Sequence, residues 1–211
     1  MKKISFLIFL FFLSSSIHSQ TFRVSKNVIS TSLFQPFAPV GGYTVAYERM
    51  IDPGYSSNAA QFSYKLNATL ISSTKKAKFI TVNSQTFYDE DAYQFFGYSI
   101  LPELKYYFTW DAPTGVYLDL FGNYTSYTSI YTDITISEVD SEDKRFKKIG
   151  RGVGLGFQFK IFDNYTLDFI GGYHLQNINS ETKGIGSDEF IKNPNEKDEN
   201  LYFNVFFGIN F

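Results

Sequence analysis

The sequence predicts an all-β fold: an eight-stranded antiparallel up-and-down transmembrane β-barrel, preceded by a cleaved signal peptide. Apolar and polar residues alternate in eight segments, as they do on the two faces of β-strands. The connections between these segments alternate between short turns and long polar loops. The chain is rich in aromatic residues, with 24 Phe and 16 Tyr, yet no apolar run approaches the length of a membrane-spanning helix.

Residues 1–19 have the pattern of a secretory signal peptide. Two lysines precede an apolar run over residues 4–13, and small polar residues follow. The alternatives are an N-terminal membrane anchor and a buried strand, but the run is too short to cross a bilayer as a helix. We expect cleavage between Ser19 and Gln20, which leaves a barrel domain over residues 20–211.

Charge and cysteine content exclude several classes of protein. The chain has 21 acidic and 19 basic residues, and this mildly acidic balance argues against nucleic acid as a partner. It has no cysteine, which excludes a disulfide-stabilised scaffold and a lipid-anchored lipoprotein.

The clearest alternation lies in "AQFSYKLNATL", residues 60–70. Every even position of this segment is apolar and every odd position is polar. On a helix these residues would be scattered around the circumference, whereas on a strand they form two separate faces. Seven other segments follow the same rule less strictly: Pro102 removes a ladder donor from one, and Tyr117 and Phe121 fall on the polar side of another. The expected strands are residues 27–34, 42–51, 60–70, 97–110, 115–127, 149–161, 165–175 and 201–211.

The connections predict two different ends of the barrel. Three are short and consist of turn residues, namely residues 52–58, 111–114 and 162–164. Three are long and polar, namely residues 72–94, 134–145 and 177–200. The first connection, around residues 35–42, breaks the trend with a modest loop on the long-loop side. This asymmetry is typical of outer-membrane barrels, which have short periplasmic turns and longer extracellular loops.

Alternating strands would also fit a secreted, lipocalin-like ligand-binding barrel with its apolar side chains inside. Several apolar faces here continue for ten residues or so, which spans a band of about 25 Å at a tilt near 40° and favours lipid contact. Arg49 and Arg151 fall on this apolar face, so we expect them near strand ends at the membrane interface. Tyrosines near the ends of these faces are expected to anchor there: Tyr43, Tyr98, Tyr106, Tyr127, Tyr165 and Tyr173.

The last segment, "LYFNVFFGINF", resembles the C-terminal strand that the outer-membrane assembly machinery recognises. The residues that carry this resemblance are Phe203, Phe207, Ile209 and the final aromatic residue, Phe211. Outer-membrane lipid and that machinery are therefore the expected partners.

Further motifs resemble small outer-membrane β-barrel families of Bacteroidota, with an eight-stranded, OmpA/OmpX-like barrel. A "YER" segment begins at Tyr47, and a "PE-x-x-YY" stretch begins at Pro102 and precedes Gly115 and Tyr117. The likeness covers residues 26–211. It implies an eight-stranded barrel in the outer membrane of a Gram-negative cell, and no defined activity.

An eight-stranded barrel has room inside only for side chains, so charged residues on the polar faces should meet there. We expect them to form a paired structural core that plugs the lumen, since unpaired buried charges are costly. The alternative is a small porin-like channel, or a proton-sensitive gate through the histidine. The expected cluster is Glu48, Lys65, Glu103, Lys105, Asp119, Asp168 and His174.

No catalytic, cofactor-binding or metal-binding residues are predicted. A lipid-modifying outer-membrane enzyme is the alternative, but His174 would face the lumen and has no serine two residues away. The glycines of residues 150–156 recur at every second position, unlike a phosphate loop, and should make room for bulky side chains. The acidic tracts lack calcium-loop spacing. We expect a monomeric, non-enzymatic barrel with a structural or surface-interaction role, whose ligand is unknown and whose specificity lies in the three long loops.

Overall fold

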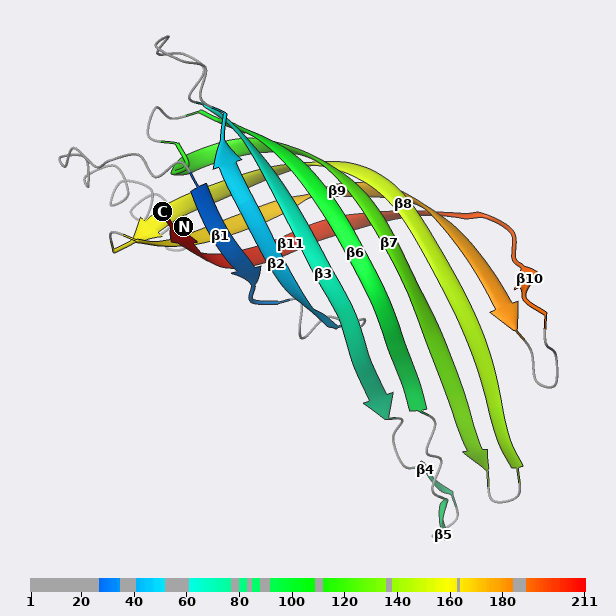
Figure 1. Ribbon diagram of the computed structural model, residues 1–211. Helices are drawn as coiled ribbons and strands as arrows, with labels where there is room; N and C mark the ends of the chain where they lie inside the picture. Colours follow the sequence, from blue (N-terminus) through cyan, green and yellow to red (C-terminus); the bar gives the residue numbers. More distant parts are fainter. Residues whose placement is uncertain are drawn as a thin grey trace, which may run out of the picture.

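A computed structural model gives the fold of most of the chain (Figure 1). It describes residues 27–34, 41–51, 61–76, 80–82, 85–87, 92–108, 112–135, 138–162, 164–183 and 189–211. The predicted signal peptide, residues 1–19, lies outside the described residues. The described residues contain no helix with the length and apolar character needed to span a membrane.

The architecture is a closed, antiparallel, up-and-down β-barrel of eight strands, as predicted. Consecutive barrel strands pair with each other, and β1 pairs with both β2 and β11, which closes the sheet. Closure leaves no open edge at this level of the barrel. The barrel strands are β1 (Asn27–Ser32), β2 (Gly42–Met50), β3 (Phe62–Lys76), β6 (Ala92–Tyr107), β7 (Gly115–Thr135), β8 (Glu138–Ile161), β9 (Tyr165–Lys183) and β11 (Glu196–Asn210).

Three short elements accompany the barrel. Strands β4 (Ile80–Val82) and β5 (Gln85–Phe87) form a separate two-stranded sheet between β3 and β6. Strand β10 (Ile191–Lys192) extends the pairing along β9 beyond the start of β11.

The strands are much longer on one side of the barrel than on the other. Strand β1 has 6 residues and β2 has 9, whereas β7 has 21 and β8 has 24. Strands β3 and β6 to β9 therefore continue past the barrel as a curved sheet, with β4 and β5 beyond the ends of β3 and β6 (Figure 1). We call the part of β6, β7, β8 and β9 beyond the level of Tyr98 and Ile149 the protruding sheet.

The prediction that residues 134–145 form a long loop is wrong. Strand β7 runs to Thr135 and β8 begins at Glu138, so most of this segment is strand. The two other long connections are also partly strand, because β3 and β9 extend to Lys76 and Lys183. Beyond the apolar band the strands no longer separate an apolar face from a polar one. The alternation therefore fades while backbone pairing continues.

Two local expectations need correction. Tyr127 does not anchor at the outer surface; it faces inward and its ring stacks on Phe146 at 4.8 Å. Arg49 is exposed next to the end of β2. Arg151 is also exposed, but β8 runs on past the barrel, so Arg151 lies two residues from Ile149, where the protruding sheet begins, and not near the end of its strand. The interruption expected at Pro102 is present on one side only: Pro102 pairs with β3 but not with β7. The β6–β7 register nevertheless continues unchanged on either side of this gap, which is confined to Leu101 and Pro102.

Candidate functional site

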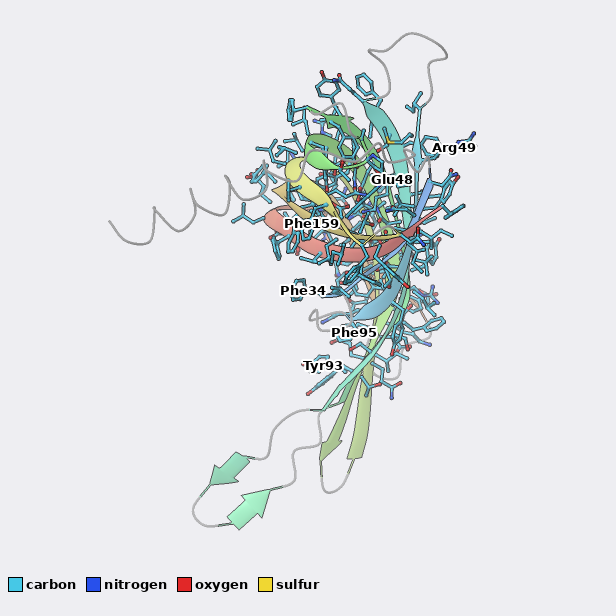
Figure 2. All side chains as sticks on the ribbon, turned by 90° about the vertical axis from the view of Figure 1, so that its left-hand side faces the viewer. Phe34, Glu48, Arg49, Tyr93, Phe95 and Phe159 are labelled. Atoms are coloured by element: carbon cyan, nitrogen blue, oxygen red, sulfur yellow. The ribbon has the colours of Figure 1, made fainter. Side chains whose placement is uncertain are left out.

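Polarity inside and outside the barrel is the reverse of that in a soluble barrel. Large apolar side chains point outward, with Leu201 88% exposed, Tyr43 70% exposed and Leu155 60% exposed. Charged side chains are buried inside, with Lys105 and Asp119 both 0% exposed. Glu48 lies within the barrel while the next residue, Arg49, points away from it (Figure 2). The period of two along each strand produces this separation.

Two lysines and three carboxylates form an ion-pair network across the interior. Lys105 Nζ lies 2.8 Å from Asp168 Oδ2 and 3.1 Å from Glu48 Oε2. Lys65 Nζ lies 2.9 Å from the same Asp168 oxygen and 3.8 Å from Glu103 Oε2. Lys65 and Asp168 come from β3 and β9, which are not neighbours in the sheet. These pairs therefore connect opposite walls of the barrel.

Hydroxyl groups complete the bonding of the two central carboxylates, and an amide oxygen lies beside Lys105. Ser63 Oγ and Tyr107 OH each lie 2.6 Å from Glu48 Oε1, to which they donate. Tyr117 OH donates to Asp168 Oδ1. Gln158 Oε1 lies 3.4 Å from Lys105 Nζ, within hydrogen-bonding reach. Such partners are what makes a buried charge tolerable, because an unpaired one is strongly unfavourable.

Aromatic rings fill the remaining volume around the ammonium groups. Lys65 Nζ lies 3.4 Å from the centre of the Phe206 ring, and Lys105 Nζ lies 4.3 Å from the centre of the Tyr117 ring. Both are cation–π contacts, which favour a desolvated ammonium group.

The glycine face of β8 makes room for side chains from neighbouring strands. A Cβ atom on Gly152 would lie 2.3 Å from Phe121 Cζ, and one on Gly156 would lie 2.1 Å from Tyr117 Cζ. A Cβ atom on Gly150 would lie 2.4 Å from His174 Nε2. The side chains of Phe121, Tyr117 and His174 thus occupy the space along β8 that its glycines leave free.

Asp119 and His174 are buried but stand apart from the network. Neither carboxylate oxygen of Asp119 has a hydrogen-bond partner among the described residues. His174 packs on the ring of Phe121 at 5.5 Å between centroids, and its Nε2 atom has no partner in the same part of the chain. The structure therefore places all seven sequence-predicted residues inside the barrel and brings five of them into one bonded network.

Several interior residues were missed by sequence reasoning. Tyr107, Tyr117 and Gln158 are fully buried and bond to the network. Each falls on the polar face by strict alternation, so strand parity alone could have identified them. Asn67, which donates to Glu103 Oε1 at 2.7 Å, follows the same rule.

The terminal aromatic residues of the predicted assembly signal face outward. Phe203 and Phe211 are more than half exposed, and Phe207 and Ile209 are also exposed. The backbone of this end is bonded to its neighbours, since Phe211 N donates to Asn27 O and Asn210 N donates to Asn164 O.

A family model described as "Protein of unknown function (DUF3575)" matches residues 57–204. The chain belongs to the DUF3575 family. The matched range includes every residue of the interior cluster except Glu48. No curated protein matches this DUF3575 chain.

Among solved structures, the DUF3575 chain resembles a major outer membrane protein from Thermus thermophilus. The two share 14% sequence identity with a TM-score of 0.53, over 90% of this chain and 100% of the other. At this identity the likeness shows a shared barrel fold.

Proposed function

We propose that this DUF3575 protein is an integral outer-membrane β-barrel with a structural or surface-interaction role and no enzymatic activity. The observation that carries the proposal is the reversed polarity: apolar side chains cover the outside and the charged residues are buried inside. A soluble lipocalin-like barrel requires the opposite arrangement. Lipid is the medium in which an exterior of this kind is stable.

The filled interior favours a structural role over a channel. Lys65, Lys105 and Asp168 connect opposite walls, and Tyr107 and Tyr117 are both fully buried between them. An ion would have to break these contacts to pass. The placement among small Bacteroidota barrels and the monomeric state stay predictions.

The protruding sheet is the part that supports an interaction role. Its inward face carries aromatic rings in mutual contact, including Tyr93 with Tyr131 at 4.8 Å and Tyr127 with Phe146 at 4.8 Å. Tyr93 and Phe95 lie on this sheet, beyond the barrel (Figure 2). Exposed aromatic rings such as that of Tyr93 suit recognition of a partner outside the membrane.

Membrane fractionation followed by electrophoresis with and without boiling tests the proposal. We expect the protein in the outer-membrane fraction, with a mobility that changes once heat unfolds the barrel. Recovery in the soluble fraction with an unchanged band would contradict the membrane assignment.

Two further measurements test the rest of the proposal. In planar bilayers we expect no steady conductance, and regular unitary currents would favour the channel instead. Lipid A from a deletion strain, complemented with the wild type or with His174→Ala, should be the same in each case. A change that depends on His174 would indicate a lipid-modifying enzyme.

A further inference from the structure

The barrel interior contains more acidic than basic groups. Four carboxylates are buried there, on Glu48, Glu103, Asp119 and Asp168, against the ammonium groups of Lys65 and Lys105. His174 is the remaining ionisable group of the predicted cluster and has no ion pair with any of them among the described residues. With His174 neutral, this buried set has two more negative than positive charges.

The excess is located at Glu103 and Asp119. The three ammonium protons of Lys105 are directed to Glu48, Asp168 and Gln158, at 2.8 to 3.4 Å. Lys105 is therefore not available to Asp119, although the two residues are directly opposite in the β6–β7 register. Lys65 Nζ bonds to Asp168 and stays 3.8 Å from Glu103 Oε2, which is too far for a hydrogen bond.

An amide oxygen lies next to the same acidic pair. Asn67 is 3% exposed. Its Nδ2 atom donates to Glu103 Oε1 at 2.7 Å and to Leu101 O at 2.9 Å. Its Oδ1 atom has no hydrogen-bond partner among the described residues. Glu103 Oε2 and both oxygens of Asp119 also lack hydrogen-bond partners there. All of these unpartnered atoms are acceptors.

The register brings the three side chains together. Asn67 pairs with Leu101, two residues from Glu103, and Glu103 pairs with Phe121, two residues from Asp119. Side chains in such diagonal positions on one face of adjacent strands are within reach of each other. Strands β3, β6 and β7 thus present a row of inward-facing oxygens.

We propose that Asn67, Glu103 and Asp119 bind one calcium ion inside the barrel. Carboxylate and amide oxygens are the ligands that hard cations take, and Ca²⁺ accepts irregular geometry more readily than Mg²⁺. A divalent cation also balances the two excess negative charges. The proposed site has two carboxylates and one amide oxygen; no group of three His, Asp or Glu in the described residues is arranged to hold a metal ion.

Calcium binding to the folded barrel would stabilise it, because the three residues lie on separate strands and do not form a site in the unfolded chain. The full-length protein, purified in detergent and freed of metal with a chelator, is titrated with CaCl₂, MgCl₂ or NaCl. Calorimetry gives the stoichiometry, and urea unfolding gives the midpoint. We expect about one calcium bound per chain, a higher midpoint in CaCl₂, and a smaller response to MgCl₂ or NaCl.

Two substitutions test the ligands. Asp119→Asn and Glu103→Gln keep the size of the side chain, and each should weaken calcium binding at least tenfold and abolish the shift in midpoint. Only the fraction that changes mobility on heating is scored, so unfolded protein does not count. Glu196→Gln, on an exposed residue of β11, is the matched control and should bind calcium as the wild type does.

Three results would overturn the proposal. One is wild-type protein that binds no calcium, in which case the acid pair is balanced by a proton. Another is undiminished binding by folded Asp119→Asn or Glu103→Gln. The last is loss of binding in Glu196→Gln, which would place the calcium on the exposed acidic segments.

Discussion

Tyr117 occupies the space that Gly156 leaves by having no side chain: a Cβ atom on Gly156 would lie 2.1 Å from Tyr117 Cζ and 2.3 Å from its hydroxyl oxygen. The same hydroxyl donates to Asp168 at the centre of the ion-pair network. Packing and charge pairing in the interior therefore depend on one another.

Gly156→Ala should destabilise the barrel by about 1–3 kcal/mol, because a buried ring must move to admit the methyl group. Gly171→Ala is the control, since a Cβ atom there meets nothing closer than 3.9 Å. Urea unfolding in detergent micelles, followed by loss of the heat-dependent mobility shift, measures both. Equal midpoints for the two variants would show that the Tyr117 ring is not held against β8.

Lys105→Met should cost about 3–5 kcal/mol, because it leaves the carboxylates of Glu48 and Asp168 buried with fewer partners. Lys192→Met, on an exposed residue of β10, should change the free energy of unfolding by less than about 0.5 kcal/mol. Urea midpoints in the same micelles compare the two. A Lys105→Met variant as stable as the wild type would mean that the ion pairs do not contribute.

A charged side chain introduced halfway along the outer face of the barrel tests whether that face contacts lipid or water. Leu155 lies in the middle of the apolar face of β8, and Ile149 lies six residues further towards the protruding sheet; both are exposed. In lipid, Leu155→Arg should cost about 2–4 kcal/mol and Ile149→Arg only about 0–1 kcal/mol. Unfolding from lipid vesicles is the measurement. Two small and equal effects would mean that the outer face contacts water.

Tyr127→Ala should loosen the protruding sheet without unfolding the barrel. The ring is buried between Phe95 and Phe146, beyond the apolar band. Amide exchange in the outer halves of β7 and β8 should become at least tenfold faster, which corresponds to about 1.4 kcal/mol. The mobility shift on heating should remain. Thr128→Ala, at the next position and on the opposite face, should leave exchange nearly unchanged.

Strand alternation predicted the barrel and the interior positions of its charged residues. Lys65, Lys105 and Asp168 each lie between apolar neighbours along a strand, and one face of each strand must avoid lipid. The partners of each charge could not be predicted, because Lys65 meets Asp168 across the barrel and not on an adjacent strand. That contact depends on strand tilt and stagger, which no local pattern encodes.

The protruding sheet was missed for a related reason. Alternation reveals a strand only where its two faces meet different surroundings. Residues 134–145 are rich in charged residues, so the sequence there is typical of a loop although most of its backbone pairs as strand. Tyr127 was misplaced because an aromatic residue near the end of the apolar band suits an interface anchor and an inward stack equally well.

The length of β7 and β8 has a practical consequence. Ile149 lies eleven residue steps after Glu138, so at roughly 3.3 Å per residue this part of β8 extends about 36 Å along the strand beyond the apolar exterior of the barrel. An epitope or fluorophore inserted between Thr135 and Glu138 would therefore lie well beyond the lipid headgroups. Antibody labelling of intact cells at that tip would then report orientation and folding in one step.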